Sequence, residues 1–96
     1  ASLSLRDAYQ RAIDNGIVLI ASAGNESRNN DTTARFPTNY DPMITVASTD
    51  RTDTLSSFSN FGISAVELAA PGREVRTTIY PGIYGNATGT SFAAAL

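Results

Sequence analysis

The sequence predicts an α/β protein that forms part of a doubly wound, mostly parallel sheet. A stretch of helical periodicity at residues 4–15 is followed at once by a continuous apolar run at 17–21, and a second such run occupies 43–47. Continuous runs rich in β-branched residues are typical of strands in a parallel sheet that helices cover on both faces. Residues 92–96 are expected to start a final apolar helix, of which the sequence contains only about one turn, too short to be stable alone. We therefore expect these residues to be a fragment of a larger domain.

The first predicted helix, residues 4–15, carries a single apolar stripe. Ser4 can cap its N-terminus, and Asn15 followed by Gly16 ends it, because glycine readily adopts the left-handed conformation found after a helix. The stripe recurs at helical spacing and consists of Leu5, Ala8, Tyr9, Ala12 and Ile13.

Loops and strands are predicted in alternation along the rest of the chain. Residues 22–37 are small and polar and are expected to form a loop, whereas 65–70 and 75–79 are short strands. The turn signals are Pro71-Gly72, Pro81-Gly82 and Gly85-Asn86.

Composition excludes several classes of function. The formal net charge is −2, and the seven basic residues, all arginine, are scattered along 96 positions without a basic run. This pattern argues against a nucleic-acid partner and against a polybasic membrane surface. The longest strongly apolar stretch, residues 17–21, is far too short to cross a bilayer, so we expect no membrane span.

The chain contains no cysteine and no histidine. Disulfide scaffolds and zinc sites built from these residues are therefore excluded. Because histidine is the commonest general base, a histidine-dependent mechanism would need a residue from outside this sequence. The chain has no lysine but ten serines, eleven threonines and seven asparagines, a composition that suits an exported protein, and we expect an extracellular location.

Two short segments carry side chains suited to catalysis. Asn25 follows the predicted strand in the sequence Ala-Gly-Asn, and an amide at the carboxyl end of a strand can donate a hydrogen bond to a developing oxyanion. Ser91 follows Gly89 and Thr90 at the start of an alanine-rich helix, where backbone N–H groups favour a nucleophile that becomes anionic. Taken separately, an ordinary turn and an ordinary helix cap are the commoner interpretations.

In combination and in this order, these segments resemble the C-terminal half of a subtilisin-like serine protease. The segments that carry the resemblance lie at residues 21–25, 58–62, 69–72 and 89–94. The resemblance extends over essentially the whole chain, so residues 1–96 are expected to be the C-terminal portion of a single peptidase domain. It implies a doubly wound, mostly parallel sheet with the active site at the strand ends.

The resemblance also implies roles for particular residues. Ser91 matches the nucleophile and Asn25 the side-chain oxyanion donor, with the Ser91 backbone N–H as the second donor. Gly89 would keep the approach to the serine free of side chains. The catalytic Asp and His come first in this family's chain order, so both are expected upstream, and the fragment alone is expected to be inactive. The intact parent would hydrolyse peptide bonds through an acyl-enzyme, with polypeptide substrates and the remainder of its own domain as partners.

Substrate and metal sites follow from the same resemblance. Gly24, Glu26 and Arg35 are expected around the pocket for the P1 side chain of the substrate. Some family members hold a structural cation, such as calcium, near the segment matching residues 40–43, with a carboxylate where Glu67 stands; a solvated Glu67 without an ion is an equal alternative. The chemistry itself requires no cofactor.

The chain departs from the family pattern at three positions, and other functions stay open. Ala95 and Leu96 stand where the family usually has proline and histidine, and Phe92 replaces a more common methionine. The related sedolisins share Gly-Thr-Ser but use an aspartate as oxyanion donor, so Asn25 favours the subtilisin type. The alternatives are a pseudoprotease of the same fold and a non-catalytic binding module in which Asn25 and Ser91 are only a turn and a cap.

Overall fold

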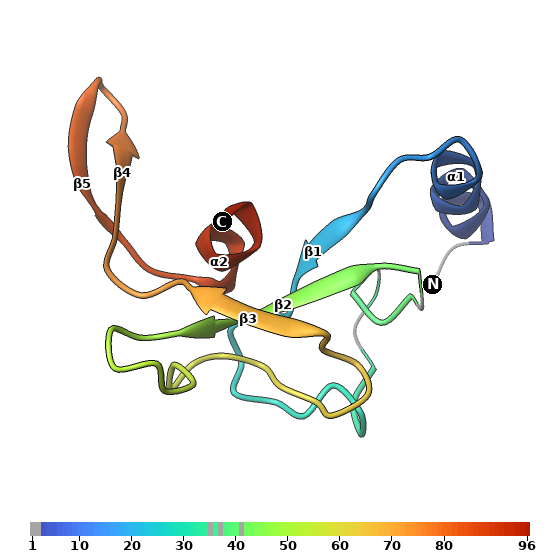
Figure 1. Ribbon diagram of the computed structural model, residues 1–96, viewed down its shortest axis with the longest axis horizontal. Helices are drawn as coiled ribbons and strands as arrows, with labels where there is room; N and C mark the ends of the chain where they lie inside the picture. The colour runs from blue at the N-terminus through green and yellow to red at the C-terminus, as the bar shows by residue number, and fades with distance from the viewer. Residues whose placement is uncertain (1–2, 35, 37, 41) are drawn as a thin grey trace.

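The computed structural model describes residues 3–34, 36, 38–40 and 42–96. Its elements in chain order are α1 (Leu3–Asp14), β1 (Ile20–Ser22), β2 (Ile44–Thr49), β3 (Leu68–Pro71), β4 (Val75–Ile79), β5 (Ile83–Ala87) and α2 (Thr90–Ala95). The strands β1, β2 and β3 form a parallel sheet in that order, and β4 pairs with β5 in a separate antiparallel hairpin (Figure 1). The expected α/β class with a parallel sheet is confirmed.

The central strand β2 organises the sheet. Its parallel partners are in register at Ser22 with Val46 on one side and at Val46 with Leu68 on the other. Because all three strands run in one direction, their carboxyl ends meet at one edge, and the loops that follow them leave from that edge. Helix α2 packs against all three strands (Figure 1).

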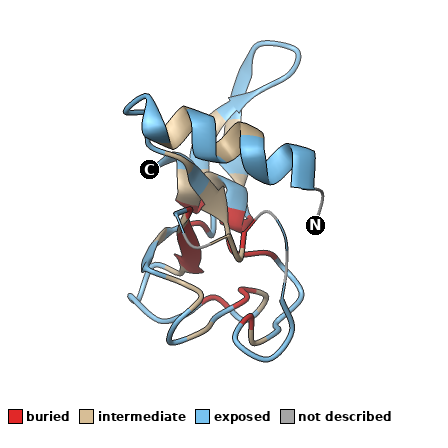
Figure 2. Ribbon diagram, turned by 90° about the vertical axis from the view of Figure 1, so that its right-hand side faces the viewer, coloured by how far each residue is buried: buried red, intermediate tan, exposed pale blue. Residues whose placement is uncertain are grey.

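The interior holds small apolar residues and a larger set of polar ones. The buried apolar residues are Ala23, Met43, Val46, Ala47 and Ala93, each at most 4% exposed. The largest fully buried side chains are all polar, namely Asn30, Asn60, Thr45, Thr90, Ser48, Ser56 and Ser59. Within the described part of the chain, every buried side-chain nitrogen or oxygen has a hydrogen-bond partner. Figure 2 shows the buried segments in the sheet and in the loops beneath it.

The predicted helix is present, but it stands away from the sheet (Figure 1). Its apolar stripe is the less exposed side, although no residue of α1 is buried. Tyr40 is its main contact: the Tyr40 hydroxyl donates to Gln10 Oε1 at 2.7 Å, and the Tyr9 and Tyr40 rings are 6.2 Å apart. Ser4 lies inside the helix, so its predicted role as cap is wrong. The helix ends as predicted, with Gly16 at φ +81°.

The first strand is shorter and later than predicted. Residues 17–21 were expected to be a strand buried on both faces, whereas β1 covers only Ile20–Ser22. The side chains of Ile17, Val18 and Ile20 are 54%, 67% and 53% exposed. These apolar side chains have the composition of a buried strand, but the described residues leave more than half of each one exposed.

Strand β2 covers Ile44–Thr49 rather than the predicted residues 43–47. Two further predictions also differ from the structure, and one strand agrees with it. Strand β3 starts at Leu68, because residues 62–66 form a turn closed by the hydrogen bond from Val66 N–H to the Gly62 carbonyl. Gly85 and Asn86 were predicted as a turn but lie inside β5, where pairing with β4 overrides local preference. Strand β4 has the predicted bounds. Among the described residues, no helix is long and apolar enough to cross a membrane.

We expect the isolated 96-residue chain to self-associate through the exposed apolar surface around β1. Unpaired strand edges and apolar patches of this kind favour intermolecular contact. Sedimentation velocity should show dimers or larger species, and the variant Val18→Lys with Ile20→Lys should shift the distribution toward monomer. A monomeric wild-type chain with a sharp two-state unfolding transition would contradict the prediction.

Candidate active site

The carboxyl edge of the sheet brings Asn25 and the segment before Ser91 together. Asn25 Oδ1 accepts hydrogen bonds from both the backbone N–H and the hydroxyl of Thr90, each at 2.9 Å. The Gly24 N–H donates to the same Thr90 hydroxyl at 3.2 Å. Thr90 is completely buried. These contacts link positions 65 and 66 residues apart, and the two bonds to Asn25 Oδ1 fix which end of the Asn25 amide faces Thr90.

Two N–H groups at this edge are left without partners in the described part of the chain. The amide nitrogen of Asn25, Nδ2, makes no hydrogen bond there, and neither does the backbone N–H of Ser91. The neighbouring N–H groups are occupied, because Thr90 N–H donates to Asn25 and Phe92 N–H donates to the Gly89 carbonyl at 3.2 Å. Asn25 and Ser91 are both exposed residues, so both free donors belong to the surface of the molecule.

Gly89 is required by its backbone conformation. It has φ 155° and ψ 158°, a region that residues with a side chain rarely adopt. A Cβ at this position would lie 3.8 Å from Asn25 Nδ2 and 3.7 Å from the Phe92 ring. Glycine therefore permits the chain to enter α2 in this geometry and leaves space beside the Asn25 amide.

The segment after β3 is hydrogen-bonded to the Gly89 turn. Gly72 N–H donates to the Thr49 carbonyl at 3.1 Å, and Gly89 N–H donates to the Gly72 carbonyl at 2.7 Å. A Cβ at Gly72 would lie 2.7 Å from the Gly89 carbonyl oxygen and would also overlap the Ser48 side chain. Gly72 thus connects the end of β2 to the turn that carries Ser91.

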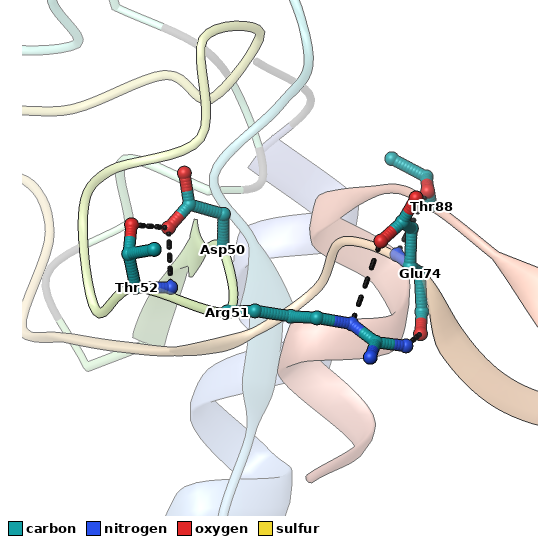
Figure 3. Close-up of polar contacts among 5 residues, drawn as sticks. All are labelled: Asp50, Arg51, Thr52, Glu74 and Thr88. Atoms are coloured by element: carbon teal, nitrogen blue, oxygen red, sulfur yellow. Dashed lines mark hydrogen bonds and ion pairs between the residues drawn. The ribbon is translucent and has the colours of Figure 1, made fainter.

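A second contact joins the same segment to the residue before Gly89. Glu74 N–H donates to the Thr88 hydroxyl at 3.0 Å (Figure 3). Arg51 Nε lies 3.4 Å from Glu74 Oε2, but both side chains are more than half exposed, so this ion pair adds little stability. The Glu74 N–H is thus the contact that joins this segment to Thr88.

The Asp50 carboxylate organises the turn after β2. Its Oδ1 accepts hydrogen bonds from the Thr52 hydroxyl at 2.7 Å and the Thr52 N–H at 2.9 Å (Figure 3), and from the Thr54 N–H at 3.2 Å. These bonds favour the ionised form. They lower the pKa of Asp50 from its ordinary value of 3.8, with the Thr52 hydroxyl as the largest cause.

The residues expected to line the P1 pocket are only partly described. Gly24 is buried, and Arg35 lies outside the described residues. Glu26 Oε2 accepts from the Asn25 N–H at 3.1 Å. A hollow of about 90 Å³ lies beside Glu26, and Arg28 and Ala34 also line it. The assignment of Gly24, Glu26 and Arg35 to substrate binding stays a prediction.

Glu67 lies at the opposite end of the sheet from Asn25. Its Oε2 accepts the Thr45 N–H at 2.7 Å, and its own N–H donates to the Thr45 carbonyl at 3.1 Å. The carboxylate thus extends the pairing between β2 and β3 just before β3 begins. The described residues gather no group of three or more His, Cys, Asp or Glu side chains. A cation at Glu67 stays a prediction, and no chemical step depends on it.

Sequence reasoning missed the residues that hold the site. The sequence places Thr90 in the motif before Ser91 and Gly72 in a turn, but it indicates no role for Asn60. The signal was present, since all three lie in the segments that carry the family resemblance. Their partners, however, are 17 to 66 residues away and follow only from the tertiary structure.

We expect Gly72→Ala to destabilise the intact protein by about 1–3 kcal/mol, because the added methyl group has no space against the Gly89 backbone. Urea unfolding would measure the change. Gly85→Ala is the matched control, since its Cβ would meet only the flexible end of Ile79. Equal losses in both variants would show that the contact between Gly72 and Gly89 has no special importance.

We expect the Asp50 carboxylate to stabilise the protein above the pKa of the unfolded group and to lose this effect as pH falls through the lower folded value. Asp50→Ala should therefore lower the unfolding midpoint at neutral pH, and its difference from wild type should shrink below about pH 4. Asp7→Ala on α1 controls for the loss of one surface charge. A difference that is independent of pH would contradict the prediction.

Comparison with known proteins agrees with this geometry. The protein-family model described as "Subtilase family" matches residues 2–96 of this chain. Thermitase from Thermoactinomyces vulgaris is 40% identical over 89 residues, which cover 93% of this chain and 30% of thermitase. Alkaline serine exoprotease A from Vibrio alginolyticus is 39% identical, covering 96% of this chain and 17% of the relative.

Solved structures show the same similarity. A cold-adapted subtilisin-like serine proteinase superposes with a TM-score of 0.85 at 38% identity, covering 98% of this chain and 33% of that chain. The prenylagaramide maturation protease PagA superposes with a TM-score of 0.87 at 27% identity, covering 98% of this chain and 34% of that chain. The present chain thus spans about a third or less of each of these proteins. With the match over residues 2–96 and the arrangement of Asn25, Gly89 and Thr90 at the sheet edge, the chain belongs to the subtilase family.

Proposed function

We propose that the intact protein is a serine endopeptidase that hydrolyses peptide bonds through an acyl-enzyme. The observation that carries the proposal is the pair of unused N–H donors, Asn25 Nδ2 and Ser91 N–H, beside the exposed Ser91 side chain. Donors that are already oriented in the resting protein need no reorganisation when negative charge develops on a substrate oxygen. Membership of the subtilase family supports the same conclusion.

In the proposed reaction, Ser91 Oγ attacks the carbonyl carbon of the scissile peptide. The carbonyl oxygen becomes an oxyanion and accepts hydrogen bonds from Asn25 Nδ2 and Ser91 N–H. Thr90 keeps Asn25 in the productive orientation, because rotating the amide by half a turn would present an acceptor to the oxyanion and would break both bonds to Oδ1. Collapse of the tetrahedral intermediate expels the amine, and water then hydrolyses the acyl-enzyme.

The general base must come from outside these 96 residues, since they contain no histidine. We assign this base to a histidine that an aspartate orients, both in the remainder of the peptidase domain. That remainder is the partner that this chain requires. The histidine takes the Ser91 proton and later gives it to the leaving amine. The 96-residue chain alone is accordingly proposed to be inactive, as the C-terminal portion of one domain.

The remaining details of the proposal rest on the family resemblance and on composition. Polypeptides are the proposed substrates, with the P1 side chain bound near Gly24, Glu26 and Arg35. A structural cation at Glu67 and an extracellular location are proposed on the same basis. One matched relative, from Bacillus subtilis, is named as a major intracellular serine protease, so membership of the family does not by itself imply export.

We expect a serine-directed peptidyl phosphonate to label the intact protein at Ser91, and we expect Ser91→Ala to abolish the labelling. Mass spectrometry of tryptic peptides would locate the adduct. Ser64→Ala, which changes an exposed serine in a turn, is the matched control and should leave labelling intact. Failure of the folded parent protein to react would favour the pseudoprotease or the binding module.

We expect Asn25→Leu to lower kcat by roughly 10²–10³, about 2.7–4 kcal/mol, with little change in KM, a range established with subtilisin itself rather than derived from this geometry. The reason is the loss of a donor that acts only on the oxyanion. Asn86→Leu, an exposed substitution on β5, is the control and should leave kcat unchanged. An unchanged kcat in Asn25→Leu would mean that Asn25 is only a turn residue.

A further inference from the structure

We propose that Asn60 is a positioning residue that holds the backbone on both sides of Asn25, so that the Asn25 amide points at the oxyanion. The inference rests on the proposed function, because it assigns a role toward the same reaction. Asn60 lies in the segment 58–62, which the sequence singled out and which the proposed chemistry does not otherwise use.

The Asn60 side chain is buried and fully hydrogen-bonded. It is 1% exposed. Its Oδ1 accepts the Glu26 N–H at 2.9 Å and the Arg28 N–H at 3.0 Å. Its Nδ2 donates to Asn30 Oδ1 at 3.0 Å and to Glu26 Oε1 at 3.2 Å. Both acceptor sites and both donor hydrogens of the amide are therefore used.

These contacts enclose Asn25 from both directions along the chain. Before Asn25, the Gly24 carbonyl accepts the backbone N–H of Asn60 at 2.9 Å. After it, the Glu26 N–H donates to the Asn60 side chain. Glu26 adds a third link, since one of its carboxylate oxygens accepts from Asn60 Nδ2 and the other from the Asn25 N–H. The Asn25 backbone is thus held through Asn60, while its amide is held separately by Thr90.

The position of Asn60 is itself restrained. The Phe58 carbonyl accepts the Ser27 N–H at 2.9 Å, and the Phe61 N–H donates to the Arg28 carbonyl at 3.0 Å. The segment 58–61 therefore lies along the loop that follows β1 and is bonded to it on both sides of Asn60. The segment that carries Asn60 and the loop around Asn25 are thus held to each other at several points.

An amide meets these requirements and few other side chains do. Aspartate would keep the acceptors for the two N–H groups but would lose both donors and would place a second negative charge beside Glu26. An apolar residue would leave the Glu26 and Arg28 N–H groups without their acceptor, and an unsatisfied buried donor is costly. Substitution should therefore displace the loop, and a shift of this kind affects catalysis because the donor must match the oxyanion position.

The test is a double-mutant cycle in the intact peptidase with Asn60→Asp and Asn25→Ala. We expect Asn60→Asp to lower kcat about tenfold with little change in KM. In the Asn25→Ala background the same substitution should change kcat less than about twofold, because the group it positions is absent. Equal losses in both backgrounds, or no loss in either, would overturn the proposal.

Ser59→Ala separates positioning from stability. Ser59 is as buried as Asn60, but its hydroxyl accepts the Ser48 N–H at 3.0 Å and donates to the Asn60 carbonyl, and it makes no hydrogen bond to the described residues around Asn25. It should lower the unfolding midpoint while kcat stays within about twofold of wild type. A loss of kcat in Ser59→Ala as large as that in Asn60→Asp would overturn the proposal.

Amide hydrogen exchange in the wild-type parent gives a measurement that does not need a folded variant. The N–H groups of Glu26 and Arg28 belong to exposed residues, yet both should exchange slowly because Asn60 accepts them. Rapid exchange of both would overturn the proposal even if every Asn60 variant fails to fold. Failure of the proposed function is a different result, in which the folded wild-type parent hydrolyses no peptide while the Glu26 and Arg28 N–H groups still exchange slowly. If the parent is active and Asn25→Ala alone keeps full kcat, the positioning proposal is overturned.

Discussion

The hydrogen bonds of buried polar side chains at the carboxyl edge of the sheet determine how the loops of this chain meet. The apolar interior is small, and the largest fully buried side chains are amides and hydroxyls. Each must find a partner, because an unsatisfied buried polar group costs more than a formed hydrogen bond contributes. Asn60 meets this requirement through the loop after β1, and Thr90 meets it through Gly24 and Asn25. The same bonds that stabilise the interior therefore arrange the candidate active site.

The parallel sheet explains why the site lies where it does. The loops that follow parallel strands all leave the sheet at one edge. Residues from distant parts of the sequence therefore become neighbours there, although no local sequence pattern indicates it. Asn25 follows β1, Gly72 follows β3, and Gly89 enters α2 against the same edge. Backbone contacts between these loops leave little freedom for Ser91. Its own N–H and Asn25 Nδ2 make no hydrogen bond among the described residues, which is the arrangement that oxyanion stabilisation requires.

The two sides of the molecule differ in how their polar and apolar groups are paired or covered. At the carboxyl edge, hydrogen bonds join the loops to one another. The surface near α1 and β1 instead exposes the apolar side chains of Ile17, Val18 and Ile20. Helix α1 is amphipathic but has no buried residue, and Tyr40 supplies its main contacts. Burying such apolar side chains typically contributes about 1.5–3 kcal/mol each. This face therefore has the composition of an interior surface, although its apolar side chains are exposed in the described structure.

The sequence by itself determined the features that depend on neighbouring residues: the α/β class, the helix that ends at Gly16, the buried strand β2, the bounds of β4, and the order of motifs that indicates the subtilase family. Periodicity, β-branched runs and turn residues act within a few positions, so they are visible without coordinates. Only the tertiary structure decided the rest. In the structure, β1 covers Ile20–Ser22 rather than residues 17–21, and Gly85 and Asn86 belong to a strand rather than a turn. The Glu67 carboxylate accepts the Thr45 N–H. The tertiary structure also joined Asn25 to Thr90 and Asn60 to Glu26, because a hydrogen bond between residues far apart in the sequence depends on how the elements pack and leaves no periodic signal in the chain.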